Sequence, residues 1–282
     1  MLKIDSVLVD TDWLATNIEN EALVMLDASV PPAVPGYTSI NDDVEFSAIP
    51  GARRFDYDGV FCKPNSILPH MMPAQELFQQ EARKLGINAD SVVIVYDDVG
   101  LYASPRAWWM FRAMGHAQVA VLDGGLPKWI KEERGIIKQY DNSREGNFLA
   151  NLDTGLFCDF EVVLKELYEP GCQILDARSA GRFKGIDAEL RPGVRPGHMP
   201  NAKNLPFPEV LSGGELKSAE ELSDLFSQLI EKDQKIITSC GSGITACILT
   251  LAATVAGYEN LAVYDGSWAE WGLPSKLPVV TG

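Results

Sequence analysis

Residues 235–257 read KIITS-CGSGIT-ACILTLAATVAG, which is a short apolar run, a glycine-rich turn and a longer apolar run. The first run, KIITS, is typical of a buried strand. The second run is long enough for a helix that begins near Thr245. This succession predicts an α/β sheet, in which ligands bind at the carboxyl ends of the strands.

The turn itself carries a candidate nucleophile. Cys240 opens it, and Gly241 and Gly243 allow backbone conformations that direct N–H groups inward as a concave nest. The amino terminus of the following helix adds a partial positive charge, which favours the thiolate form of Cys240. A thiolate in an anion-stabilising cradle is suited to attack on sulfur, with a persulfide as the product.

Several other chemistries are disfavoured by what the loop lacks. A Cys-x5-Arg phosphatase requires arginine at position 246, which is Ala246 here, and no Gly-Lys-Ser/Thr motif is present. The five cysteines and three histidines show neither a metal-binding nor a disulfide spacing, so we expect no metal site. We interpret Cys158, Cys172 and Cys247 as small buried residues.

The chain is an internal repeat. Four segments recur in the same order in its two halves, which indicates duplication of one unit. The pairs are LVMLDAS (23–29) with CQILDAR (172–178), SAIPGARRFDYD (47–58) with GHMPNAKNLPFP (197–208), VVIVYDDVG (92–100) with KIITSCGSG (235–243), and VLDGGLPKW (121–129) with VYDGSWAEW (263–271). The offset falls from 150 to 143 between the second and third pairs, so the first copy contains about seven extra residues, near His70.

Apolar runs alternate with helical patterns in both copies, for example AEELSDLFSQLIEK (219–232) after the strand-like QILDA. This alternation predicts small parallel sheets with helices on both faces. We predict a first domain over 1–138, a polar linker over 139–158 and a second domain over 159–282. The first copy has Asp97 where the second has Cys240, so we expect only the second domain to be catalytic.

Composition limits the classes of partner. The 282 residues include 46% hydrophobic and 22% charged residues, and the net charge is −15. These values are ordinary for a packed domain, and the negative charge disfavours nucleic acid and anionic membranes as partners. No apolar run approaches the roughly 20 residues that span a bilayer. The first residues do not resemble a signal peptide, so we expect a cytoplasmic protein.

The tandem layout, Asp97 in the first copy and the loop CGSGITA (240–246) together resemble two-domain sulfurtransferases of the rhodanese superfamily, and among them the group that uses 3-mercaptopyruvate. The stretches SPRAWWMFRAMGH (104–116), LDGG (122–125) and GHMPNAKN (197–204) extend the resemblance over most of the chain. The thiosulfate-using group carries basic residues where this chain has Gly241 and Ser242.

The resemblance implies a set of substrate-binding residues. Arg182 and Arg191 are expected to hold the substrate carboxylate, with Arg195 a rival to Arg191, because guanidinium groups suit carboxylates. The loop residues Gly241, Gly243, Ile244 and Thr245 are expected to surround the persulfide. Arg178 is expected to form a structural ion pair.

The resemblance also implies a Ser-His-Asp relay beside the cysteine. Its members are expected to be Ser242, His70 and Asp58, with Asp56 as an alternative to Asp58. We interpret His116 and His198 as structural.

The implied reaction needs neither a metal nor an organic cofactor. Sulfur would pass from 3-mercaptopyruvate to Cys240 and then to cyanide, a small thiol or reduced thioredoxin, with release of pyruvate. The alternatives are the same fold acting on thiosulfate, and a persulfide relay or non-catalytic binding module.

Overall fold

The computed structural model describes residues 2–42, 46–140 and 143–282, and the chain divides into two compact units. The first unit comprises Met1–Pro64, Met72–Asp153 and Gly213–Leu216, and the second comprises Asn65–Met71, Thr154–Ser212 and Lys217–Gly282. The extra segment of the first copy, with His70, is thus part of the second unit. The domain limits at 138 and 159 stay a prediction.

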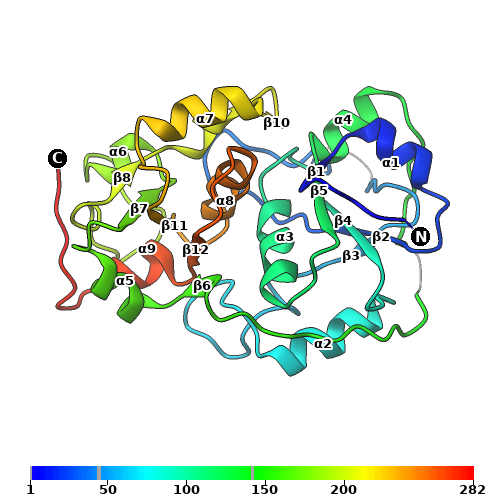
Figure 1. The fold of residues 1–282 in the computed structure, drawn as a ribbon, viewed down its shortest axis with the longest axis horizontal. Coiled ribbons are helices and arrows are strands. Elements are labelled where there is room, and N and C mark those ends of the chain that lie inside the picture. The colour runs from blue at the N-terminus through cyan, green and yellow to red at the C-terminus, as the bar shows by residue number, and fades with distance from the viewer. Residues whose placement is uncertain (1, 43–45, 141–142) are drawn as a thin grey trace. The chain divides into compact units, whose positions relative to one another are not determined.

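The first unit contains a parallel sheet with the strand order β1-β5-β4-β2-β3 (Figure 1). Its long strands are buried throughout and mostly apolar, as expected for strands that are covered on both faces. The elements are β1 (Leu8–Val9), α1 (Thr11–Asn17), β2 (Leu23–Asp27), β3 (Arg53–Arg54), α2 (Gln75–Lys84), β4 (Val92–Tyr96), α3 (Ser104–Ala113), β5 (Val119–Leu122) and α4 (Gly125–Lys131).

Side chains that alternate along β4 face different layers. Val92 and Ile94 pack in one core with Leu14 of α1 and Leu126 of α4. Helix α3 also packs on β4 and β5, and its Trp108, Trp109 and Met110 are buried. The tryptophan pair is therefore part of the core of the first unit.

The second unit repeats this arrangement strand for strand, with the order β6-β12-β11-β7-β8. Ile237 of β11 packs in a core with Val163 of α5 and Trp268 of α9, whereas the Thr238 hydroxyl lies 2.8 Å from the Thr250 hydroxyl of α8. The elements are β6 (Phe157–Cys158), α5 (Phe160–Glu166), β7 (Cys172–Asp176), α6 (Ala180–Phe183), β8 (Lys203–Asn204), η1 (Phe207–Val210), α7 (Ala219–Ser227), β11 (Lys235–Ser239), α8 (Ala246–Val255), β12 (Leu261–Tyr264) and α9 (Ser267–Trp271). The predicted duplication and fold class are confirmed.

A small hairpin, β9 (Leu211–Ser212) and β10 (Glu215–Leu216), lies between η1 and α7. The helix α7 is shorter than the pattern over 219–232 predicts, because the chain turns after Gln228 and buries Ile230.

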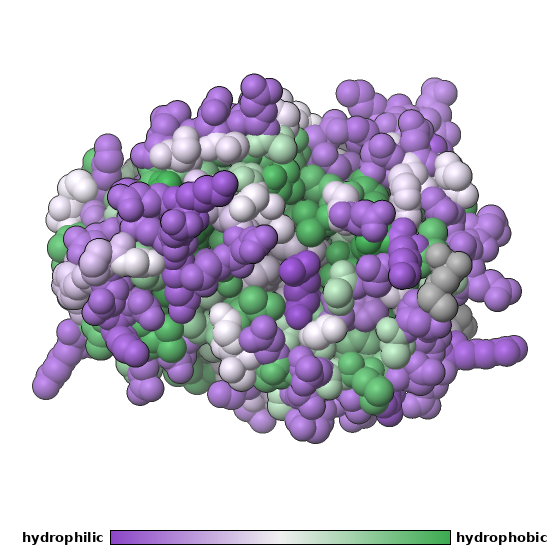
Figure 2. Space-filling model, in the orientation of Figure 1, coloured by the Kyte–Doolittle hydropathy of each residue, from purple (hydrophilic) through white to green (hydrophobic). Residues whose placement is uncertain are grey.

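Hydrophilic residues cover much of the surface visible in Figure 2. Among the residues that the structure describes, no helix combines the length and the apolar character needed to cross a membrane.

Candidate active site

The loop after β11 is a tight turn around the sulfur of Cys240. Gly243 has a φ of +82°, a conformation that favours glycine, and its N–H donates to Sγ of Cys240 at 3.1 Å. Thr245 is the residue before α8. Gly241 is not among the glycines with a positive φ, so of the two loop glycines only Gly243 has a conformation that favours glycine.

The outer side of this loop is held by the start of α9. The N–H groups of Trp268 and Ala269 donate to the carbonyls of Cys240 and Gly241, at 3.0 and 2.9 Å. The hydroxyl of Ser267 accepts the N–H of Cys240 at 3.2 Å. Because the two carbonyls bind α9, they are kept away from the concave side of the turn.

The matching loop of the first unit shows what such a turn can bind. Asp97 follows β4 as Cys240 follows β11, and its carboxylate accepts six hydrogen bonds within its own loop. The donors are the N–H groups of Val99 and Gly100 (both 3.0 Å) and of Tyr102, Ala103 and Ser104 (3.0, 2.8 and 2.8 Å), and the Ser104 hydroxyl (2.7 Å). This loop therefore binds an anion through backbone amides, as predicted for the turn at Cys240.

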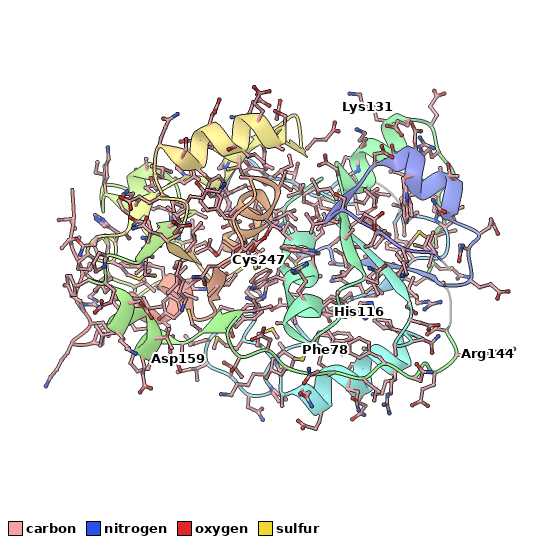
Figure 3. The ribbon with its side chains drawn as sticks, in the orientation of Figure 1. Phe78, His116, Lys131, Arg144, Asp159 and Cys247 are labelled. Atoms are coloured by element: carbon pink, nitrogen blue, oxygen red, sulfur yellow. The ribbon has the colours of Figure 1, made fainter. Side chains whose placement is uncertain are left out.

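Cys240 is 2% exposed, yet its sulfur faces a backbone amide. Burial raises the pKa of the Cys158 thiol to about 12 and that of Cys172 to about 11, so both thiols stay protonated near neutral pH. Cys158 and Cys247, the latter on α8 (Figure 3), are buried as expected, whereas Cys172 is only partly buried.

Two guanidinium groups approach the loop at Gly241. A Cβ atom at this glycine would lie 3.4 Å from Nη2 of Arg182 and 3.9 Å from Nη1 of Arg191. Arg182 is on α6, which follows β7, and Arg191 lies on the loop after it. The structure thus brings the two predicted arginines to one side of the cysteine loop.

The rival arginine, Arg195, has a different environment. Its guanidinium donates to the carbonyls of Trp271 (2.8 Å) and Leu277 (3.0 Å). These contacts hold the segment after α9, which indicates a structural role.

Arg178 forms the structural ion pair that the sequence predicts. Its guanidinium binds Asp176 at 2.6 Å and Glu189 at 2.7 Å, and lies 4.1 Å from the ring centroid of Trp268. Burial opposes the charge of Arg178, but the carboxylates of Asp176 and Glu189 outweigh that effect and raise its pKa. Sequence analysis missed Glu189, which also binds Arg182 at 2.6 Å, because no motif or periodicity marks a loop residue of this kind.

Two of the three histidines make structural contacts, as interpreted. His116 (Figure 3) lies 2.9 Å from the carbonyl of Ser91, and His198 lies 2.8 Å from the carbonyl of Phe183 and stacks on that ring.

The third histidine, His70, has a φ of +58° and belongs to the second unit, whereas Asp58 and Asp56 belong to the first. One oxygen of Asp56 accepts the N–H groups of Asp58 (3.0 Å) and Gly59 (2.9 Å), and Asp58 is exposed. The relay of Ser242, His70 and an aspartate stays a prediction.

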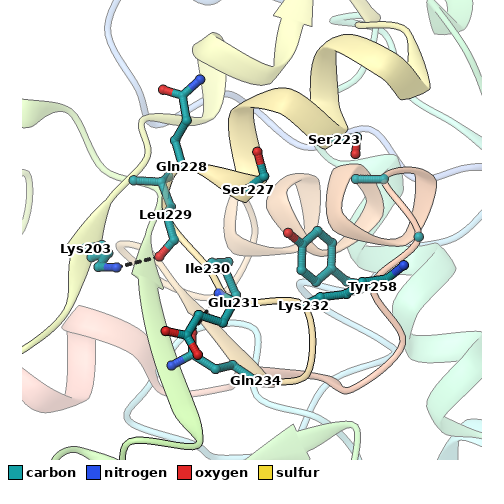
Figure 4. Close-up of a pocket in the computed structure, with 12 residues that line it drawn as sticks. Lys203, Ser223, Ser227, Gln228, Leu229, Ile230, Glu231, Lys232, Gln234 and Tyr258 are labelled. Carbon is teal, nitrogen blue, oxygen red and sulfur yellow. Dashed lines mark hydrogen bonds between the residues drawn. The ribbon is translucent and has the colours of Figure 1, made fainter.

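A pocket of about 740 Å³ lies elsewhere in the second unit (Figure 4). It is lined by residues that precede β11, such as Leu229 and Gln234, and by Tyr258 after α8. Lys203 donates to the carbonyl of Leu229 at 2.5 Å on its wall. Since Cys240 follows the other end of β11, this pocket is separate from the cysteine loop.

Comparisons with known proteins agree with this fold. A family model described as "Rhodanese-like domain" matches residues 10–132 and 160–273. The chain is 39% identical over 274 residues to the 3-mercaptopyruvate sulfurtransferase of Escherichia coli (strain K12), with 96% of each chain covered. It is 36% identical over 272 residues to the thiosulfate sulfurtransferase of Gallus gallus, covering 94% of this chain and 92% of that one.

The crystal structure of SseA from Escherichia coli, which its description assigns to the "Rhodanese" fold, is similar with a TM-score of 0.81 and 36% identity. The match covers 94% of this chain and 100% of the other. Fold and site together define a duplicated α/β protein with a cysteine in the glycine-rich turn after β11. The chain belongs to the family of proteins with rhodanese-like domains.

Proposed function

We propose that this chain is a sulfurtransferase that takes sulfur from 3-mercaptopyruvate on Cys240, releases pyruvate and passes the sulfur to a thiophilic acceptor. The observation that carries the proposal is the approach of Arg182 and Arg191 to Gly241, the residue next to Cys240. Two guanidinium groups beside a thiol suit a donor that carries both a carboxylate and a transferable sulfur.

The first half-reaction follows from this arrangement. The Cys240 thiolate attacks the sulfur of 3-mercaptopyruvate, an S–S bond forms, and the C–S bond breaks with its electron pair moving to the enolate of pyruvate. Arg182 and Arg191 stabilise the enolate and its carboxylate. A proton on carbon completes pyruvate, and the outer sulfur stays on Cys240 as a persulfide.

The loop around Asp97 supports a specific cradle for that persulfide. Positions 97–104 align with 240–247 without a gap, so the donors to the two Asp97 oxygens correspond to five amides of the catalytic loop. Sγ would accept from Ser242 and Gly243, and the outer sulfur would accept from Thr245 and Ala246. The N–H of Cys247 is not counted, because it donates to the carbonyl of Ile244 at 3.0 Å. Ile244 contributes the apolar wall between these two sets.

Proton transfer is assigned to Ser242, His70 and Asp58. Asp56 uses an oxygen to cap its own turn, which favours Asp58 as the third member. The second half-reaction moves the outer sulfur to cyanide, a small thiol or reduced thioredoxin, and no cofactor takes part. The five free cysteines are compatible with a cytoplasmic location.

Mass spectrometry after exposure to 3-mercaptopyruvate tests the proposal. We expect one added sulfur, about 32 Da, on the peptide that contains Cys240. Cys240→Ser should abolish both this adduct and pyruvate release, whereas the matched control Cys62→Ser, which changes a partly buried cysteine of the first unit, should retain both. Pyruvate release by the Cys240→Ser variant would show that Cys240 is not the nucleophile.

The same preparation distinguishes the alternative donor. Because a related Gallus gallus protein is named a thiosulfate sulfurtransferase, kcat/KM should be measured with both donors. We expect the larger value for 3-mercaptopyruvate, since Gly241 and Ser242 add no cation for a doubly charged donor. A larger value for thiosulfate would reverse the choice of substrate.

A further inference from the structure

Arg182 and Arg191 lie on the same side of the loop but differ in how they are held. Arg182 donates through Nε (3.2 Å) and Nη2 (2.6 Å) to one oxygen of Glu189. Arg191 makes no hydrogen bond or ion pair with any residue within 2–42, 46–140 and 143–282. The guanidinium of Arg182 therefore has its orientation fixed by the protein, whereas that of Arg191 is not held by a side-chain contact of this kind.

Glu189 is itself anchored in the core of the second unit. Its other oxygen accepts Nη1 of Arg178 at 2.7 Å, and the side chains of Arg178 and Glu189 are only 1% and 5% exposed. Arg178 is fixed in turn by Asp176 at the end of β7 and by the carbonyl of Gly197. Because Arg178 has several partners, the position of Glu189 is set by the sheet and not by its loop alone.

The loop returns to α6 through a close backbone approach. The carboxylate of Asp187 lies 1.9 Å from the place that a Cβ of Gly181 would occupy, and the N–H of Asp187 donates to the Gly181 carbonyl at 3.0 Å. This turn brings Glu189 back onto Arg182, seven residues earlier in the chain. A side chain at 181 would displace the carboxylate of Asp187.

The four charges alternate in sign from the sheet to the loop: Asp176, Arg178, Glu189 and Arg182. Exposure rises along the series, from 0% for Asp176 to 12% for Arg182. Glu189 occupies the Nε edge of Arg182, so Nη1 and the second N–H of Nη2 remain on the side toward Gly241. That side is where the donor carboxylate binds in the proposed function.

We propose that Glu189 is the positioning residue for Arg182, and that it sets the affinity for donors with a carboxylate by fixing the guanidinium before they bind. This inference rests on the proposed function, which assigns Arg182 to the substrate. A fixed guanidinium loses less conformational freedom on binding than a mobile one, so the contact is stronger in the complex. The effect acts mainly on binding of the donor carboxylate, because Arg182 keeps its charge beside the enolate whether or not Glu189 is ionised.

The test is a double-mutant cycle with steady-state kinetics on the full chain. We expect Glu189→Gln to raise KM for 3-mercaptopyruvate about tenfold and to change kcat less than about threefold, since binding energy that is equal in ground and transition states affects KM alone. In an Arg182→Lys background the same change should raise KM less than about twofold, because the two residues act through one contact.

Two further variants separate positioning from general damage. Glu132→Gln breaks an ion pair with Arg134 (2.7 Å) in the first unit and should leave KM within about twofold of wild type. Glu189→Asp keeps the charge but shortens the side chain, and it should give an intermediate KM. Glu189→Asp also provides the KM measurement if Glu189→Gln does not fold.

The outcomes distinguish this inference from the proposed function. A KM within twofold of wild type for Glu189→Gln or Glu189→Asp, or the same factor in both backgrounds, overturns the role of Glu189. Wild-type protein that gains no sulfur on Cys240 at saturating 3-mercaptopyruvate overturns the proposed function instead. If the sulfur adduct forms at saturating donor in every variant and only KM changes as expected, the result supports both the role of Glu189 and the proposed function.

Discussion

Ser267 is a residue where backbone strain coincides with a contact to the nucleophile's backbone. It has a φ of +48°, and the matching position of the first copy is Gly125, with a φ of +52°. A non-glycine residue in this conformation costs about 1 kcal/mol. The Ser267 hydroxyl accepts the N–H of Cys240 and donates to the carbonyl of Tyr264, so the side chain offsets that cost.

Two substitutions separate the strain from the hydroxyl contact. Ser267→Ala keeps the strained backbone and loses both bonds, whereas Ser267→Gly loses the bonds and relieves the strain. We expect Ser267→Gly to be more stable than Ser267→Ala by about 1 kcal/mol in urea unfolding, with kcat reduced by a similar factor in both. Equal stability of the two variants, or wild-type kcat in either, would contradict this reading of Ser267.

Residues differ in how far sequence alone can place them. Cys240 could be found because a glycine-rich turn between a strand and a helix is a local pattern. Glu189 could not, because its partners Arg178 and Arg182 are joined to it only by the folding of a loop. Arg182 and Arg191 were expected only through family resemblance, and the structure places both beside Gly241.

At the scale of elements, the loop between β4 and α3 is an anion site occupied by its own side chain. Asp97 satisfies five backbone N–H groups and one hydroxyl. Removal of its carboxylate leaves buried donors without an acceptor, at a cost of about 1–3 kcal/mol each before the loop relaxes. Asp97, which stands where the second copy has Cys240, therefore stabilises the first copy.

This loop gives a graded stability prediction. Asp97→Ala should lower the free energy of unfolding by at least about 3 kcal/mol, whereas Ser104→Ala, which removes one of the six donors, should lower it by about 1 kcal/mol. Urea unfolding followed by tryptophan fluorescence, which Trp108 and Trp109 on α3 report, provides the measurement. A similar loss in the free energy of unfolding for both variants would show that the Asp97 carboxylate stabilises the loop no more than one of its donors does.

The elements themselves were predictable in proportion to their length. The run KIITS is β11 residue for residue, and VVIVYD contains β4, because a run of five residues that contains adjacent β-branched side chains makes a recognisable strand. The edge strands β1, β3, β6 and β8 have two residues each, too few for any periodicity. Pairing with a neighbouring strand defines them, and sequence alone does not record that contact.

At the scale of the whole molecule, buried ionisable groups in the first unit act on stability in opposite directions. Burial raises the pKa of Asp98 and Asp123, so the folded state holds their protons more tightly than the unfolded chain. Burial lowers the pKa of His116 below its ordinary 6.5, against hydrogen bonds that raise it. The two carboxyls favour the folded state as the pH falls, and the histidine disfavours it.

His116 gives the last prediction. Below pH 6.5 the unfolded chain binds a proton at this histidine that the folded state excludes, so the stability it contributes is present above 6.5 and is lost as the pH falls. His116→Asn has no such proton to bind and leaves Asp98 and Asp123 unchanged. From pH 7.5 to 5.5, the free energy of unfolding should therefore fall by up to about 1.4 kcal/mol more in wild type than in the variant. Urea unfolding at the two pH values measures this difference, and an equal change in both proteins would mean that His116 titrates alike when folded and unfolded.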